Sequence, residues 1–296
     1  MGYIKNIEMK LLVIGTGLLG KKIVETGYER FDIVATYHKE KPKVESELYK
    51  LDITDKNSVL NLVEKIKPTV IIHTAALTNV DYCEKNKAKA SKVNVEGTKN
   101  VAIAAEKIGS KLVYVSTDYV FDGKKGFYKE DDKPNPINYY GLTKLEGERV
   151  VEKICNDYLI VRPSVIYGEG RKNFATWIID ELKNSREVKI TKEHFASPTL
   201  NTDLAEQIFA LIEQEKEGIF HTAGRERISR YDFALRIAEI FELDKSLIKP
   251  VSAEDLNWIA RRPRDSSLDV SRIFKIKRPL DIREGLKKLK AELKQK

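Results

Sequence analysis

The stretch KLLVIGTGLLGKKIVETG, residues 10–27, decides the fold. An apolar run ends at Gly15 and a segment with helical spacing follows, which predicts a strand, a tight loop and a helix. The loop carries Gly15, Gly17 and Gly20 in a G-x-G-x-x-G pattern. In such loops the first glycine permits the turn, the second lets the backbone approach a pyrophosphate, and the third lets the helix pack close to the sheet. The pattern therefore favours a dinucleotide site over a structural glycine turn.

Further apolar runs follow along the chain, and segments in which apolar residues return every three or four positions separate them. The runs cover residues 32–37, 69–75, 111–116, 158–168 and 218–223. Strands that alternate with helices predict an α/β fold with a doubly wound parallel sheet of the Rossmann type.

The alternation breaks down after Gly168, where helical segments are joined by loops rich in Arg and Pro. We therefore expect a dinucleotide-binding domain over residues 1–168 and a smaller mixed α/β substrate lobe over residues 169–296. Segments at about 200–225 are expected to return to the first domain. Residues 1–8 are expected to be a loose extension, because MKLLVIG at Met9 resembles a natural start.

Composition limits the functional class. Of the 296 residues, 42% are hydrophobic and 33% charged, and the formal charge of +8 is spread without an Arg-rich block, which predicts a solvated surface and no nucleic-acid partner. The two cysteines, Cys83 and Cys155, have no metal-site or disulfide spacing and favour a reducing cytoplasm. No apolar run approaches the roughly 20 residues that span a bilayer, so no membrane partner is expected.

The end of the second predicted strand bears on the choice of cofactor. An NAD site places an acid about 20 residues beyond the glycine loop, but TYHKEKPK puts His38, Lys39 and Lys41 there, with Glu40 the one carboxylate nearby. These cations favour the 2'-phosphate of NADPH, with NADH possible and ordinary loop charges as the alternative. Asp52 is a candidate acceptor for the adenine amino group.

Two further stretches carry reactive side chains. STDYVFDG places Ser116, Thr117 and Asp118 at the carboxyl end of a buried strand, where doubly wound sheets bind ligands. In YYGLTK, Tyr140 and Lys144 are four apart on one helix face, and a nearby ammonium would lower the phenol pKa. A hydroxyl, a tyrosine and a lysine beside a dinucleotide loop describe hydride transfer to a ketone. Taken alone, STDYVFDG is equally explained as a capped loop.

Across nearly the whole chain the sequence resembles the extended short-chain dehydrogenase/reductase superfamily, and within it the dTDP-4-dehydrorhamnose reductase family. The motifs are GTGLLG, HTAALTNVDYCE, STDYVFDG, YGLTKLEGE, VRPSVIYGEG, FASPT and RRPRDSSLDVSR. The resemblance implies NADPH-dependent reduction of the 4-keto group of a nucleotide-diphosphate deoxysugar, with Thr117, Tyr140 and Lys144 as the catalytic trio. The expected cofactor contacts include Tyr140, Lys144, the three loop glycines, His38, Lys39 and Asp52. The others are Leu18, Leu19, Ile53, Ala75, Ala76, Leu77, Asn94 and Pro163. The expected substrate contacts are Thr78, Val80, Thr117, Asp118, Tyr119, Val165 and Asn173, with Arg261 from the cluster Arg225, Arg227, Arg261, Arg262 and Arg264.

Three positions depart from the family pattern. The glycine loop is one residue shorter than the usual form, Val165 stands where a Trp is common, and Asp281-Ile282 replaces an Asp-Trp pair.

Two alternatives to the reductase function stay open. One is a sugar-nucleotide epimerase or dehydratase with recycled NAD. The other is a cofactor-binding regulatory subunit like the partner of methionine adenosyltransferase. A homodimer is possible.

Overall fold

The central element of the fold is a parallel sheet. The structure is a computed structural model that describes residues 6–294, with side chains described from residue 9. Seven strands lie in the order β11-β6-β5-β4-β1-β2-β3, and every pair is parallel. The strands are β1 (Asn6–Ile14), β2 (Phe31–Tyr37), β3 (Glu47–Lys50), β4 (Val70–His73), β5 (Lys111–Val115), β6 (Tyr158–Arg162) and β11 (Gly218–His221).

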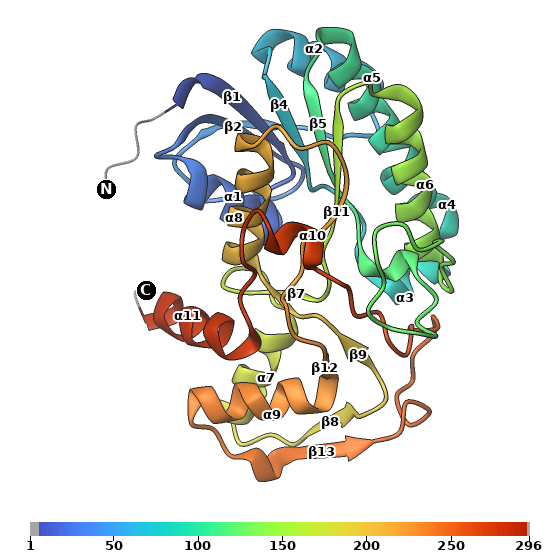
Figure 1. The fold of residues 1–296 in the computed structure, drawn as a ribbon, viewed down its shortest axis with the longest axis vertical. Coiled ribbons are helices and arrows are strands. Elements are labelled where there is room, and N and C mark those ends of the chain that lie inside the picture. Colours follow the sequence, from blue (N-terminus) through green and yellow to red (C-terminus); the bar gives the residue numbers. More distant parts are fainter. Residues whose placement is uncertain (1–5, 295–296) are drawn as a thin grey trace.

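Helices cover both faces of this sheet (Figure 1). Successive residues of a strand point to opposite faces, and β1 shows it: Leu11 and Val13 enter one apolar core, whereas Leu12 and Ile14 enter the other. The first core is closed by α1 (Leu18–Gly27) and α8 (Asn201–Glu213), and the second by α2 (Lys56–Ile66), α5 (Thr98–Ile108) and α6 (Tyr139–Ile154). The predicted doubly wound fold is confirmed.

A second lobe lies beneath the carboxyl ends of the strands (Figure 1). It has its own apolar core, formed by α7 (Phe174–Lys183), α9 (Arg230–Phe241), α11 (Ile282–Lys294) and the parallel pair β8 (Val188–Thr191) and β13 (Ile248–Val251). Residues 201–221 run back to the first domain as α8 and β11. The short elements are α3 (Val80–Lys85), α4 (Lys87–Ser91), η1 (Lys92–Gly97), η2 (Asp118–Val120), β7 (Ile166–Tyr167), β9 (Phe195–Ala196), β10 (Thr199–Leu200), β12 (Ile228–Ser229), η3 (Lys245–Leu247) and α10 (Ser271–Phe274).

The amino-terminal strand differs from the expectation. β1 begins at Asn6, which pairs with Phe31 of β2, and the register shifts between Asn6 and Lys10. Residues 6–8 therefore belong to the sheet and not to a loose extension. An irregularity in the pairing lets the strand begin before Met9. Residues 1–5 of the expected extension lie outside the described residues.

The strand order fixes where a ligand binds. After β1 the chain winds outward to β2 and β3, and after β3 it returns to β4 on the other side of β1. The loops that follow β1 and β4 therefore diverge at their carboxyl ends, which opens a crevice between them. The amides of Thr74 and Ala75 both bind the Ile14 carbonyl, at 3.0 and 2.9 Å, so the two loops are joined at their base.

Candidate active site

The glycine loop after β1 fits a dinucleotide pyrophosphate. Gly15 has φ +96°, and a Cβ there would lie 2.8 Å from the Ala75 Cβ, while a Cβ on Gly20 would lie 1.9 Å from the Gly15 carbonyl oxygen. By contrast, a Cβ on Gly17 would have no atom nearer than 3.9 Å apart from those of Gly17, Thr16 and Leu18. Helix α1 starts at Leu18 with no side-chain cap and no acid in its first turn. Its amides are thus free to bind phosphate, and the shorter loop keeps all three glycine functions.

The predicted adenosine contacts divide between exposed and buried side chains. His38 and Lys39 are exposed at the end of β2, and His38 Nε2 lies 3.7 Å from Asp52 Oδ2. Asp52 Oδ1 accepts from the Thr54 amide and hydroxyl at 2.9 and 2.8 Å, so this carboxylate also fixes its own turn. Ile53 and Leu19 are buried in the two cores. These two residues can offer a cofactor only their backbone.

The loop after β4 is fastened from behind. Asn94, 1% exposed in η1, accepts from the Leu77 amide at 2.8 Å and donates to the Leu77 carbonyl at 3.0 Å. Its amide nitrogen also donates to Thr143 Oγ1 on α6 at 3.0 Å. Ala75, Ala76 and Leu77 are half-buried at the crevice. Asn94 therefore positions this loop for a cofactor and is itself covered by protein.

The structure brings the predicted catalytic trio together. Thr117 follows β5, whose pairing with β6 continues through the Ser116 amide to the Val161 carbonyl at 2.8 Å. Tyr140 and Lys144 lie on the buried face of α6. Asn138 caps this helix by accepting from the Gly141 amide at 2.8 Å. The three side chains are 6%, 9% and 2% exposed.

The electrostatics of the trio differ from the prediction. Burial raises the pKa of Tyr140, and a hydrogen bond between its hydroxyl and that of Thr117 acts in the opposite direction. Burial lowers the pKa of Lys144 to about 7, partly offset by the charge of Glu148. The Lys144 ammonium lies 4.0 Å from the centre of the Tyr114 ring, so it faces an aromatic ring. Tyr140 thus holds its proton at neutral pH, as a proton donor must.

A buried ion pair behind the trio is absent from the sequence prediction. Glu148, one turn after Lys144, binds Arg162 of β6 through both oxygens, at 2.9 and 2.7 Å. The Ser116 hydroxyl donates to the same carboxylate. No local sequence pattern predicts this pair, because Glu148 and Arg162 lie on different elements.

Tyr119 and Val80, two of the expected substrate contacts, lie in the same cluster as Tyr140. The Tyr119 and Tyr140 rings are 6.1 Å apart in an edge-to-face arrangement, and Val80 and Leu77 pack on this cluster. Thr78 is exposed beside them. Arg230, the first residue of α9, approaches the Tyr119 hydroxyl at 3.4 Å. This arginine is not among the predicted contacts.

Asp118 and Asn173 differ from the prediction, because their polar atoms are used within the protein. Asp118 is 2% exposed and accepts from the hydroxyls of Thr117, Ser164 and Ser266. Asn173 caps α7 by accepting from the Thr176 amide at 3.3 Å, and its own amide nitrogen binds two carbonyls of the preceding loop. Pro163 is likewise buried, and its carbonyl accepts from the Asp118 amide at 3.0 Å. These residues hold the framework of the site.

The arginine cluster is mostly neutralised. Arg262 binds both oxygens of Asp81 at 2.7 and 3.0 Å, Arg227 binds Asp265 at 2.7 Å, and Arg225 pairs with Asp281. Arg261 is exposed, and its carbonyl accepts from Asn138 at 2.9 Å. Within residues 9–294 its guanidinium takes part in no ion pair.

Val165 lies between β6 and β7 with φ +38°. A β-branched side chain seldom adopts this left-handed conformation, which costs on the order of 1–3 kcal/mol. The Thr199 amide, which donates to the Val165 carbonyl at 3.2 Å, helps to hold the backbone there.

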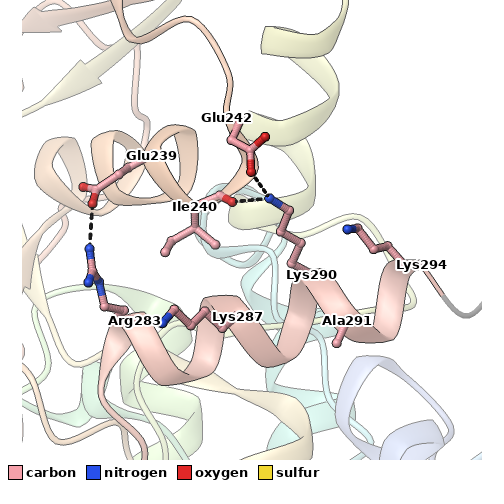
Figure 2. A pocket seen from close by; sticks show the side chains of 8 residues that line it. All are labelled: Glu239, Ile240, Glu242, Arg283, Lys287, Lys290, Ala291 and Lys294. Carbon is pink, nitrogen blue, oxygen red and sulfur yellow. Dashed lines mark hydrogen bonds and ion pairs between the residues drawn. The ribbon is translucent and has the colours of Figure 1, made fainter.

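A separate surface hollow of about 480 Å³ lies between α9 and α11. Figure 2 shows that Arg283 and Lys290 on its wall already pair with Glu239 and Glu242. It contains none of the predicted site residues, and we do not regard it as the reaction site. Within the described part of the chain, no helix is long and apolar enough to cross a membrane, and no group of three acidic, His or Cys side chains is arranged for a metal.

The family model of the RmlD substrate binding domain matches residues 9–295. The chain belongs to this family. A dTDP-4-dehydrorhamnose reductase of Aggregatibacter actinomycetemcomitans is 34% identical over 95% of this chain and 98% of its own length. The crystal structure of a Bacillus anthracis dTDP-4-dehydrorhamnose reductase in complex with NADP superposes with a TM-score of 0.89, at 33% identity over 98% of this chain and 100% of that one. Methionine adenosyltransferase 2 subunit beta of Bos taurus is 33% identical over 89% of this chain and 81% of its own length. The predicted family membership is confirmed.

Proposed function

We propose that this RmlD-family protein uses NADPH to reduce the 4-keto group of a nucleotide-diphosphate deoxysugar. The observation that carries the proposal is the meeting of Thr117, Tyr140 and Lys144 at the strand ends, beside a glycine loop that leaves Gly17 open. The named reductases among its relatives, one of them solved with NADP, support the same assignment. NADPH, when bound, supplies the hydride.

The chain's own residues handle the ketone oxygen. The Thr117 hydroxyl, which donates to Asp118 in the structure, turns its hydrogen to this oxygen. Tyr140 gives the oxygen a proton as negative charge develops there. Because burial raises the pKa of Tyr140, the phenol enters the reaction protonated. Lys144, partly protonated near neutral pH because burial lowers its pKa to about 7, stabilises the phenolate that remains.

The remaining contacts concern the substrate and the cofactor. Arg230 supplies the charge that a sugar-nucleotide diphosphate requires, since it is half-buried beside Tyr119 and has no carboxylate partner among the described side chains. Val80 and Val165 border the sugar. At the cofactor end, exposed His38 and Lys39 favour the 2'-phosphate of NADPH.

The state of the two cysteines bears on the cellular compartment. Cys83 and Cys155 are free and buried, which supports a reducing, cytoplasmic location. We further propose that the protein is a homodimer, which sedimentation at several concentrations would test.

The decisive experiment adds dTDP-4-keto-6-deoxy-L-mannose and NADPH to purified protein and follows the absorbance of the reduced cofactor. We expect its oxidation only when the sugar is present. No oxidation by protein that demonstrably binds NADPH would contradict the reductase. In that case the 33% identity to methionine adenosyltransferase 2 subunit beta would favour a regulatory subunit, and capture of a methionine adenosyltransferase would be the next measurement.

A further inference from the structure

We propose that Arg171, in the loop between β7 and α7, binds the pyrophosphate of the dinucleotide together with the glycine loop. The inference rests on the proposed NADPH site and adds to it a residue from outside the glycine-loop domain. Outside Gly17 and its chain neighbours Thr16 and Leu18, the atom nearest to a Cβ built on Gly17 is an Arg171 guanidinium nitrogen, at 3.9 Å. The guanidinium therefore borders the open space into which the α1 amides point.

The loop that carries Arg171 is fixed to the first turn of α1. Asn201 of α8, which is fully buried, donates to the Leu18 carbonyl at 3.2 Å and to the Glu169 carbonyl at 3.0 Å. Lys22 pairs with Glu169 at 3.4 Å. A Cβ on Gly170 would lie 3.5 Å from Leu18 Cδ1. The loop is thus held against the helix whose amides would receive the phosphates.

Asn173 orders the same loop from its other end. Its amide nitrogen donates to the Gly168 carbonyl at 2.7 Å and to the Arg171 carbonyl at 2.9 Å. These bonds close the segment between β7 and α7 into a compact turn with Arg171 at its centre. These bonds fix the backbone from which the Arg171 side chain extends toward Gly17.

The charges nearby leave Arg171 available. Lys21 and Lys22 of α1 both pair with Glu25, so these cations are already compensated. No carboxylate among the described side chains lies within ion-pair distance of Arg171, which is exposed. An arginine presents paired donors that match phosphate oxygens, and an anion that binds the α1 amides would meet this fork.

Fluorescence titration of NADPH binding tests the inference without relying on turnover. Arg171→Gln should raise the NADPH Kd by about tenfold, the scale of one charge-assisted contact. The Kd of Arg171→Lys should lie between those of the unaltered protein and Arg171→Gln. Arg264→Gln, which removes the same charge from a side chain 80% exposed and 3.9 Å from Glu193, should leave the Kd within about twofold. Adenosine 2'-monophosphate, which has no pyrophosphate, should bind equally to the unaltered protein and to Arg171→Gln.

Each contrary result has a distinct meaning. An unchanged NADPH Kd in Arg171→Gln would overturn the inference, as would an equal loss for adenosine 2'-monophosphate. If Arg171→Gln weakened the binding of dTDP but not that of NADPH, Arg171 would serve the sugar nucleotide, and the inference would also be overturned. If the unaltered protein bound no NADPH, the proposed function itself would fail.

Discussion

Glu148 and Arg162 form a two-point ion pair in which both side chains are 2% exposed. The pair joins α6 to β6 one helical turn below Lys144. It also binds the Ser116 hydroxyl, next to Thr117. The relative position of α6 and the strand ends therefore depends on it.

Loss of one partner should destabilise the fold strongly. Arg162→Leu is expected to lower the free energy of unfolding by about 3–5 kcal/mol, because it leaves a buried carboxylate without its counterion. The double variant Glu148→Leu/Arg162→Leu should lose less of the free energy of unfolding than Arg162→Leu. Urea unfolding measures both. Arg149→Leu, whose ion pair with Glu146 is at the surface, should cost about 1 kcal/mol or less. Equal losses for the buried and surface arginines would contradict the argument.

Tyr140→Phe should lower turnover by about 100-fold or more, since one positioned acid contributes about that factor. The NADPH Kd should stay within about twofold, because the ring remains. Steady-state rates and fluorescence titration provide the two numbers. Tyr139→Phe, which removes the adjacent phenol on the same helix, is the matched control. Retained turnover in Tyr140→Phe would remove this residue from the proposed mechanism.

Cofactor preference should depend on the exposed cations that follow β2. The unaltered protein is expected to bind NADPH more tightly than NADH. Lys39→Glu should weaken the binding of NADPH by about tenfold or more and change the binding of NADH little. Lys133→Glu, an equal charge change at another exposed lysine, should leave the ratio of the two constants intact. Tighter binding of NADH by the unaltered protein would refute the assignment.

Stability should fall in mild acid. Burial lowers the pKa of His73 and His221 to about 3 and that of His194 to about 4, whereas an unfolded histidine has a pKa near 6.5. Between these values the unfolded chain binds more protons, so the free energy of unfolding decreases as the pH falls from about 6.5 toward 4. Urea midpoints at several pH values give the slope, and His73→Gln should reduce it. A flat profile over this interval would show that these histidines are not buried as neutral groups.

Local patterns predicted the fold, and they selected the residues of the proposed site that lie on one element or one turn. The three glycines, the apolar run of each strand and the four-residue spacing of Tyr140 and Lys144 all act within one element or one turn. The ion pair of Glu148 with Arg162, the contact of Lys144 with Tyr114 and the approach of Arg171 to Gly17 join distant segments. Their geometry depends on tertiary packing, which periodicity does not encode. Polar residues also mislead: Asp118 and Asn173 resemble ligand contacts in sequence but satisfy buried groups in the fold.

The left-handed backbone at Val165 has a consequence for engineering. Asparagine or glycine adopts φ +38° at lower cost, so selection of variants for heat resistance alone would favour them at this position. Each such replacement removes a branched side chain beside Ser164, whose hydroxyl binds Asp118 at 2.8 Å. A screen for hardier variants of this protein therefore has to score turnover together with melting temperature, because heat resistance alone would select changes in the shape of the proposed sugar site.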